Sequence, residues 1–315
     1  MMRTWGRWLA AAATLAATLA TAPALAEVPQ LPTGELTATN EMVLNTAQDR
    51  LTRMTVEVYV NGQGPFAFAI DTGADRTVIS ESLAKRLGLV GDRQAQLHGI
   101  AGVDIVATTR LASLRVGSKQ IADIRAPILP DAALGASGLL GIDAVAGQRV
   151  TMDFVDKQMT VRPTAYREPS DRDPDTITIT AKRRFGQLVL VNASVNGQRV
   201  YAIIDSGSQV TIGNPKLRRM LARREKGDEV TTELISVTGR RISADYGMLP
   251  RMKIGEVIIG DIPILYADAH PFKRYRLTNK PAMLIGVDIL RAFERVSLDF
   301  DTKKVRFHLK SEKIS

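Results

Sequence analysis

Residues 67–73 read AFAIDTG, and residues 201–207 read YAIIDSG. Each stretch is an apolar run that ends in an Asp-Ser/Thr-Gly triplet, and a Val-Asn-Gly-Gln lead-in precedes it at residues 60–63 and 195–198. An apolar run followed by turn-forming residues is typical of a buried strand that ends in a tight turn. The sequence therefore predicts two aspartates in equivalent positions, each at the end of a strand.

The rest of the chain repeats along with these two stretches. Residues 51–163 run parallel to residues 187–309, and four further pairs of blocks match in the same order after the triplets. The matched pairs are 114–117 with 252–255, 126–129 with 262–265, 139–143 with 284–288, and 150–154 with 296–300. A repeat of this length predicts a duplicated domain. Asp71 and Asp205 would then come from two related halves.

The composition of the blocks indicates strands more than helices. Most blocks are short runs rich in Val, Ile and Thr, bounded by Gly, Asn and Asp, which is the pattern of strands and hairpins. Short helices are expected over residues 81–87, which Gly88 ends, and over residues 215–224, which begin with Pro. Shorter helices are expected near Ala144 and Ile289. We therefore expect a mainly β protein with two similar halves.

The sequence divides into six segments. We expect a signal peptide, an N-terminal segment, the first repeat, a polar Pro-containing linker, the second repeat and a C-terminal tail. Their boundaries are 1–26, 27–50, 51–163, 164–186, 187–309 and 310–315. Residues 27–45 show no clear period, and a tail, a short propeptide and an edge strand all remain open for them.

The N-terminus has the three parts of a secretory signal. Arg3 and Arg7 form a basic region, an apolar run follows over residues 9–22, and residues 24–26 read ALA before Glu27. The apolar run is short for a membrane span, which needs about 20 residues. A retained N-terminal anchor is the alternative. We expect export and no stable membrane insertion after the signal is removed.

The absence of cysteine limits the chemistry. With no Cys in the sequence, disulfides, thiol catalysis and thiolate metal sites are excluded, and an exported chain without disulfides fits a bacterial periplasm. The three His residues, 98, 270 and 308, are isolated in the sequence, so we expect no metal and no cofactor. They also argue against a serine protease, although residues 205–207 resemble the nucleophile loop of trypsin-like enzymes.

The chain is basic, with a formal net charge of +9. Removal of residues 1–26, whose charged residues are Arg3 and Arg7, leaves +7. Much of the excess lies in residues 216–224, which fit a solvated helix face or a surface that attracts acidic substrates or anionic membranes. Few aromatic residues and an export signal argue against nucleic acid as a partner.

Paired aspartates have a specific chemistry. Two carboxylates held close together share one proton, so that one can activate a water molecule while the other hydrogen-bonds a peptide carbonyl. Gly73 and Gly207 would let backbone amides approach the carboxylates, and the hydroxyls of Thr72 and Ser206 could lock the two loops together. An Asx-type turn that merely ends a strand is the structural alternative for either triplet.

These motifs resemble the retropepsin-like aspartic proteases, in the fused two-repeat form found in exported bacterial proteins. The resemblance covers nearly the whole chain after the signal and is carried by residues 71–75, residues 205–208 and the apolar-apolar-Gly blocks around Gly141 and Gly286. It implies the acid protease fold, with two β-barrel-like halves related by a pseudo-two-fold axis and an active-site cleft between them. It also implies that Leu140-Gly141 and Ile285-Gly286 support the catalytic triplets from behind, and that Asp75 is a structural ion-pair residue.

The resemblance further implies flaps over the cleft. Residues 98–102 lie at the expected place in the first half, which makes Gly99, Ile100, Ala101 and Gly102 candidate substrate-binding residues. Thr238 and Gly239 are their counterparts in the second half, where an ordinary hairpin tip is an equal alternative.

The two halves also differ beside the triplets. Ala74 follows the first triplet, whereas Ser208 follows the second. We expect the Ser208 hydroxyl to hydrogen-bond the Asp205 carboxylate and to favour its charged form.

The sequence thus predicts an aspartic endopeptidase with Asp71 and Asp205 as catalytic residues. Thr72, Gly73, Ser206, Gly207 and Ser208 are expected to support the catalytic loops. The expected substrate is a polypeptide, namely segments of exported or membrane proteins in the periplasm, and the expected state is a monomer. The alternative is a duplicated module of the same kind that binds exported peptides without cleaving them.

Overall fold

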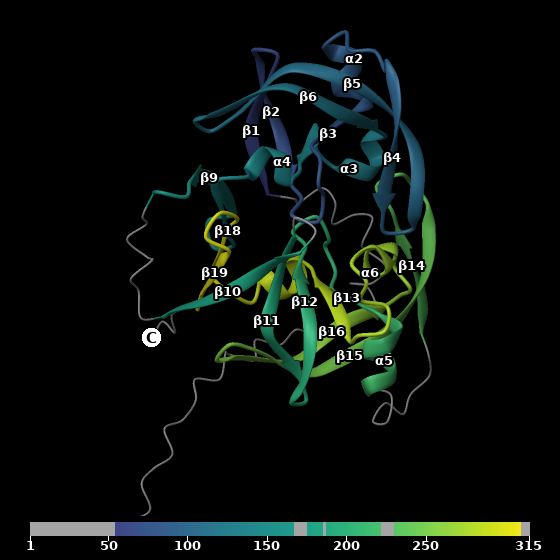
Figure 1. The fold of residues 1–315 in the computed structure, drawn as a ribbon, viewed down its shortest axis with the longest axis vertical. Coiled ribbons are helices and arrows are strands. Elements are labelled where there is room, and N and C mark those ends of the chain that lie inside the picture. The colour runs from purple at the N-terminus through teal and green to yellow at the C-terminus, as the bar shows by residue number, and fades with distance from the viewer. Residues whose placement is uncertain (1–53, 167–174, 185–186, 222–229, 310–315) are drawn as a thin grey trace, which may run out of the picture. The chain divides into compact units, whose positions relative to one another are not determined.

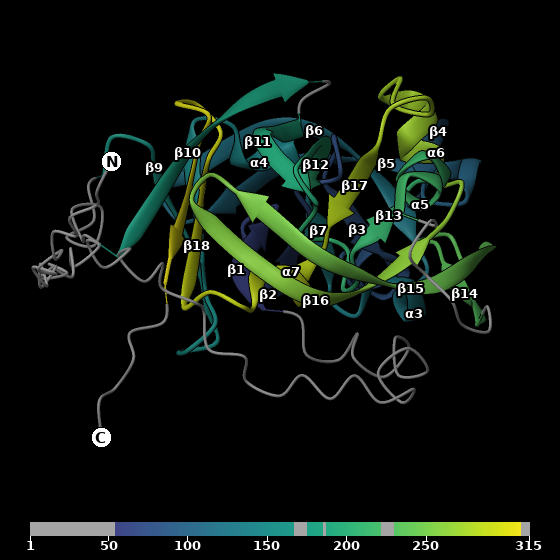
Figure 2. The ribbon, with the colours of Figure 1, turned by 90° about the horizontal axis from the view of Figure 1, so that it is seen from below.

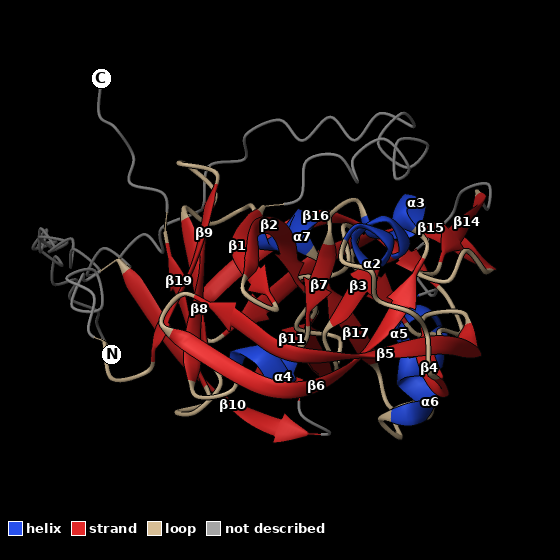
Figure 3. Cartoon of the chain, turned by 90° about the horizontal axis from the view of Figure 1, so that it is seen from above, coloured by secondary structure: helices blue, strands red, loops and turns tan. Residues whose placement is uncertain are grey.

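The computed structural model describes residues 54–166, 175–184, 187–221 and 230–309 of the 315-residue chain. The expected signal peptide, residues 27–50 and the C-terminal tail 310–315 lie outside the described residues, as does part of the expected linker. In Figure 1 the first half runs from purple to teal and the second from green to yellow. Figure 3 shows that strands account for most of the described chain.

The first half consists of a strand-rich unit with three short helices. Its elements are β1 Thr55–Val60, β2 Gln63–Ile70, β3 Val78–Ser80, α2 Glu81–Arg86, β4 Arg93–Gly99, β5 Gly102–Val116, β6 Lys119–Leu129, α3 Asp131–Leu134, β7 Gly138–Leu140, α4 Ile142–Val145, β8 Gln148–Asp153 and β9 Gln158–Pro163.

The second half repeats this order of elements. It comprises β10 Thr176–Arg184, β11 Gln187–Val195, β12 Gln198–Ile204, β13 Ile212–Gly213, α5 Pro215–Leu221, β14 Thr231–Ile235, β15 Arg241–Ile254, β16 Val257–Tyr266, α6 His270–Arg274, β17 Ala282–Ile285, α7 Val287–Leu290, β18 Arg295–Asp299 and β19 Lys304–His308.

Strand order confirms the duplication. The first sheet has the order β1-β2-β7-β3-β6-β5-β4, and β1 also pairs with β5. The equivalent strands of the second half follow the order β11-β12-β17-β13-β16-β15-β14, and β11 also pairs with β15. Each of these extra pairings closes a six-stranded barrel. The structure is therefore the expected mainly β acid protease fold with two successive barrels.

A further sheet is shared between the halves and shows the pseudo-two-fold axis directly. Its strand order is β10-β19-β18-β8-β9, in which β8 comes from the first repeat and pairs with β18 from the second. Figure 2 labels β9, β10 and β18 of this sheet. Thr151 lies opposite Ser297, its counterpart in the repeat, and their hydroxyl oxygens are 3.0 Å apart. Because equivalent residues face each other in antiparallel strands, the two halves are related by a two-fold rotation at this point.

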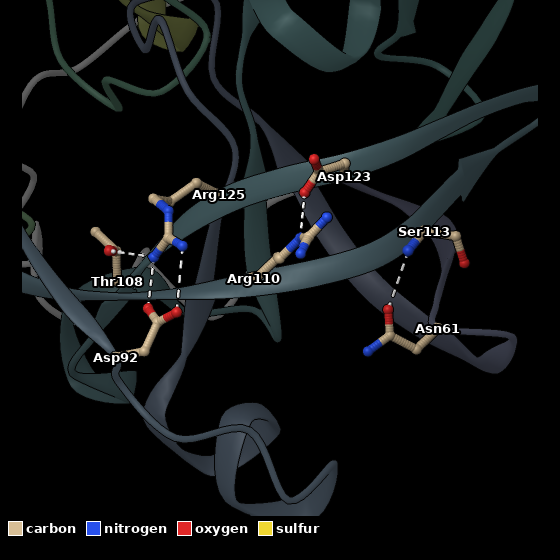
Figure 4. A network of polar contacts seen from close by, with 7 residues as sticks. All are labelled: Asn61, Asp92, Thr108, Arg110, Ser113, Asp123 and Arg125. Atoms are coloured by element: carbon tan, nitrogen blue, oxygen red, sulfur yellow. Dashed lines mark hydrogen bonds and ion pairs between the residues drawn. The ribbon is translucent and has the colours of Figure 1, made fainter.

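The shared Val-Asn-Gly-Gln lead-in forms the same hairpin turn in both halves. Asn61 and Gly62 have φ values of 50° and 77°, and Asn196 and Gly197 have 49° and 76°. Positive φ at both central residues is the geometry of the two-residue turn that matches strand twist. The side-chain oxygen of Asn61 also accepts a hydrogen bond from the Ser113 N–H at 3.1 Å, which ties this turn to β5 (Figure 4).

Alternating burial explains why these segments form strands around a core. In β1, Val56, Val58 and Val60 are buried while the residues between them are more exposed. The central strand β2 ends in three consecutive buried residues that lead directly into Asp71. The buried apolar residues of both barrels and of the shared sheet belong largely to one continuous cluster. The aspartates therefore follow strands that are fixed by the core.

The expected helices are confirmed within the described residues. The helix α2 begins after Ser80, whose side chain accepts the Leu83 N–H, and α4 and α7 lie near Ala144 and Ile289. The helix α5 covers the described part of the expected 215–224 helix.

The expected linker 164–186 contains β10, so it is not wholly a connecting segment. The described residues include no helix that is both long and apolar enough to span a membrane.

Candidate active site

Both aspartates lie directly after a central strand and are held by the strand next to it. The Asp71 N–H donates to the Leu140 carbonyl oxygen at 2.9 Å, and the Asp205 N–H donates to the Ile285 carbonyl oxygen at the same distance. In each half the two strands involved are parallel, β2 with β7 and β12 with β17. Each aspartate therefore extends a parallel strand pair at its carboxyl end.

The hydroxyls of Thr72 and Ser206 lock the two catalytic loops together. The Thr72 N–H donates to Ser206 Oγ at 3.1 Å, and the Ser206 N–H donates to Thr72 Oγ1 at 3.0 Å. Each hydroxyl then donates to a carbonyl of the opposite half, Thr72 to Ile204 at 2.9 Å and Ser206 to Ile70 at 2.8 Å. Both side chains are buried. These four bonds confirm the predicted cross-connection.

The glycines of the triplets bring the two carboxylates face to face. A Cβ on Gly73 would lie 2.6 Å from Asp205 Oδ1, and a Cβ on Gly207 would lie 2.3 Å from Asp71 Cγ. Each glycine also donates its N–H to the aspartate of its own triplet, at 2.8 Å and 3.1 Å respectively. Only a residue without a side chain fits between the two carboxylates. The structure therefore brings together Asp71 and Asp205, as the repeat predicted.

A second pair of carboxylates braces the catalytic loops from behind. Asp143 accepts the N–H and the hydroxyl of Thr77 at 2.9 and 2.8 Å, and Asp288 accepts the same two groups of Thr211 at 2.7 Å each. Each threonine hydroxyl in turn accepts the N–H of the adjacent glycine, Gly141 or Gly286. Burial raises the pKa of Asp288 to about 6. These bonds agree with the supporting role that the resemblance implied for the two glycine blocks.

A cavity of about 340 Å³ lies over the two aspartates. Its lining includes Gly73, Gly207 and Ser208 from the catalytic loops and Gly99 and Ile100 from the tip of the β4–β5 hairpin. The other candidate flap residues, Ala101, Gly102, Thr238 and Gly239, are not part of the lining. The β14–β15 hairpin contributes Ser236 and Val237 instead. Both hairpins therefore cover the cavity, but the residues of the second hairpin that face it are not the two that were expected.

The two hairpin tips also contact each other. The Thr238 hydroxyl donates to Asp104 Oδ2 at 2.6 Å, and Arg240 forms an ion pair with the same carboxylate. Ile100 packs against the hydrophobic cluster of the second half, while Val237 packs against a cluster of the first half. Thr238 thus contributes to the contact between the hairpins that close the cavity.

One prediction about the catalytic loops was wrong. Ser208 does not hydrogen-bond the Asp205 carboxylate, because its hydroxyl donates to the carbonyl oxygen of Val210 at 2.7 Å. The single hydroxyl proton is therefore used within the loop. Ser208 lines the cavity and holds the backbone that follows the second triplet.

The helix α6 contributes residues that the sequence reasoning did not assign to the site. His270, Pro271, Arg274 and Tyr275 all line the cavity. The His270 ring stacks on His98 of the first hairpin, with ring centroids 5.1 Å apart and an Nδ1–Nε2 distance of 2.9 Å. Burial raises the pKa of the Tyr275 phenol and the Asp205 charge raises it further, so this phenol stays neutral.

Asp75 is the ion-pair residue that the resemblance implied. Its carboxylate pairs with Arg274 from α6, and Gln187 donates to it at 3.4 Å and to the Gly73 carbonyl at 3.2 Å. Both partners come from the second half, so this contact joins the first catalytic loop to the opposite barrel. The sequence repeat gave no indication of this contact, because the connection that carries α6 is longer than its equivalent in the first half.

Comparison with known protein families agrees with this geometry. A family model described as "gag-polyprotein putative aspartyl protease" matches residues 56–146, and a model described as "Aspartyl protease" matches residues 191–289. The two matches contain the first and the second triplet, respectively. A search of curated proteins gave no match. Two successive matches, each on one barrel and each around one aspartate, show that the chain belongs to the retropepsin-like aspartyl protease family.

Proposed function

We propose that this protein is an aspartic endopeptidase that hydrolyses peptide bonds with a water molecule activated by Asp71 and Asp205. The observation that carries the proposal is the reciprocal packing of the triplets, in which Gly73 abuts Asp205 and Gly207 abuts Asp71. This packing places each carboxylate directly against the triplet of the opposite half. Facing carboxylates in one cavity favour the state that shares a single proton.

The reaction follows from that state. The charged carboxylate takes a proton from a water molecule as the water oxygen attacks the peptide carbonyl carbon, while the protonated carboxyl hydrogen-bonds the carbonyl oxygen. The tetrahedral intermediate then collapses, with a proton passing to the leaving nitrogen and the C–N bond breaking. The Thr72–Ser206 bonds keep the two carboxylates in register during these steps. Neither a metal nor a cofactor is required.

The substrate would be an extended polypeptide. Two hairpins cover the cavity, and a peptide between a catalytic floor and such hairpins binds as a strand. The signal-like residues 1–26 support a periplasmic location, so we propose segments of exported proteins and periplasmic parts of membrane proteins as targets. Both aspartates are in one chain, which supports a catalytically complete monomer.

A digest of a peptide library with the purified protein from Glu27 onward, followed by mass spectrometry, tests the proposal. We expect new termini at defined internal bonds, which distinguishes an endopeptidase from a peptide-binding module. A protein that retains labelled peptides on a column but produces no new termini would contradict the proposal and favour the binding module. Cell fractionation and light scattering test the location and the monomeric state separately.

A further inference from the structure

The two sides of the cavity are lined differently, and the internal repeat makes the comparison direct. After the first triplet come Asp75 and Arg76, and at the equivalent positions after the second triplet come Gln209 and Val210. All four residues line the cavity. A charged pair on one side of the two aspartates is therefore replaced by a neutral pair on the other side.

The helix α6 increases this difference. The connection between β16 and β17 spans residues 267–281, whereas the equivalent connection between β6 and β7 spans only residues 130–137. The longer connection reaches the first half, since Arg274 pairs with Asp75 and the His270 N–H donates to the Ile100 carbonyl at 2.9 Å.

The short connection forms hydrogen bonds within its own half, where the Ser137 N–H donates to the Ala67 carbonyl oxygen at 2.9 Å. Asp131 in α3 accepts hydrogen bonds from Ser82, in its own half. The long connection therefore bridges the two halves on the side of the cavity that is bounded by α6.

Among the described residues on the α6 side, one cation has no carboxylate partner. Asp75 neutralises Arg274, and Lys273 is paired with Asp268. Arg76 is exposed and forms no ion pair with any described residue. The His98 and His270 imidazoles on this side add no negative charge. An anionic group that enters here meets a free guanidinium, which suits a carboxylate because it can donate two parallel hydrogen bonds.

The opposite side offers no such partner. Val210 takes the place of Arg76 and packs against the hydrophobic cluster of the second half, from which Ile212, Leu234 and Leu284 also line the cavity. These residues favour apolar groups, because a charged group would lose its hydration there without gaining a counter-ion.

We propose that the α6 side of the cavity is a subsite for an acidic substrate side chain, recognised by Arg76, and that the opposite side takes an apolar side chain. This inference rests on the proposed peptidase function and specifies its substrate class as peptides with Glu or Asp on one side of the cleaved bond. Arg76 is then a specificity-determining residue, and it takes no part in bond cleavage.

Pairs of octapeptides that differ only by Glu or Gln at one position test this inference. Scanning the pair through all positions should give one position, on one side of the cleaved bond, where the Glu peptide has a kcat/KM about three- to tenfold higher, as for a partly screened charge pair. Arg76→Gln should bring that ratio close to 1, Arg76→Lys should retain most of it, and Arg76→Glu should favour a Lys peptide instead.

The matched control removes one positive charge elsewhere. Arg110 pairs with Asp123 on the surface of β5 and β6, outside the cavity (Figure 4), so Arg110→Gln should keep the wild-type ratio. A wild-type ratio near 1 at every position, or a ratio that Arg76→Gln leaves unchanged, would overturn the inference. If no peptide is cleaved, the proposed function fails, and the same ratio is then measured for equilibrium binding of fluorescein-labelled Glu and Gln peptides.

Discussion

The hydroxyl of Thr72 is the most informative single group to remove, because it is buried and connects the two halves. Thr72→Val keeps the side-chain volume but eliminates two hydrogen bonds, one accepted from the Ser206 N–H and one donated to the Ile204 carbonyl. A buried polar group left without its partner costs about 1–3 kcal/mol. Since two groups, the Ser206 N–H and the Ile204 carbonyl, lose this partner, we expect the free energy of unfolding to fall by about 2–6 kcal/mol.

Thr72→Ser provides the matched control. It keeps the hydroxyl and reproduces the residue that the second half already uses at position 206, so it loses only one methyl group, worth about 0.8 kcal/mol. Urea unfolding followed by far-ultraviolet circular dichroism measures both changes, since both Trp residues lie within the first 26 residues. Peptide cleavage should also fall in Thr72→Val, because the carboxylates lose their common support. Equal stabilities for Thr72→Val and Thr72→Ser would refute the reasoning.

The packing of Gly207, the buried Asp288 carboxyl and the His98–His270 contact can each be tested separately. Gly207→Ala should reduce peptide cleavage at least 100-fold, because the added Cβ would lie 2.3 Å from Asp71 Cγ and force the carboxylates apart. Burial raises the pKa of Asp288 from 3.8 to about 6. The folded protein therefore favours the protonated carboxyl, and this contribution to stability is lost as the pH rises from about 4 to above 6. Asp288→Asn should remove this part of the pH dependence of the free energy of unfolding, which amounts to about 2–3 kcal/mol. Burial and the nearby His98 lower the pKa of His270, so the contact between the two imidazoles should weaken as the pH falls below 6.5. Hydrogen exchange of the His270 backbone amide should then become faster than its intrinsic pH dependence alone would give.

Each of these predictions has its own control. Gly260→Ala should leave cleavage unchanged, because its Cβ would meet only the Pro250 carbonyl oxygen at 3.4 Å, and equal losses in the two glycine variants would contradict the packing argument. If the free energy of unfolding of Asp288→Asn depends on pH in the same way as that of the wild-type protein, this carboxyl does not titrate between pH 4 and 7. For the histidine pair, His98→Gln should remove the extra exchange at low pH, and its persistence in that variant would rule out His98 as the cause.

Much of the fold could be predicted from the sequence because the duplication is visible in it. The triplets, the Asn-Gly turns and the glycine blocks each specify a local geometry, and their repetition specifies how two such units combine. Strand β10 was missed although residues 176–181 read TITITA, an alternating pattern that is typical of a strand. The polar residues before it led to its assignment as linker.

The asymmetric parts of the site could not be predicted in this way. The helix α6 has only five residues, and its counterpart α3 has only four and lies in a shorter connection, so neither periodicity nor the repeat identifies it. Its contacts with Asp75 and His98 depend on how the two barrels face each other, which no local pattern records. The sequence does not show which acceptor the Ser208 hydroxyl takes, and the turn after the triplet directs it to the Val210 carbonyl.

The most direct test of the central claim is the cleavage rate of a single good substrate by the wild-type protein and by Asp71→Asn and Asp205→Asn. Asn preserves the shape of each side chain but cannot share a proton. General acid–base catalysis alone contributes about 10²–10⁴-fold, so kcat of each variant should fall by this factor or more. Circular dichroism should show both variants folded. Near-normal turnover in either folded variant would contradict the account, because a reaction that depends on both carboxylates cannot proceed with one.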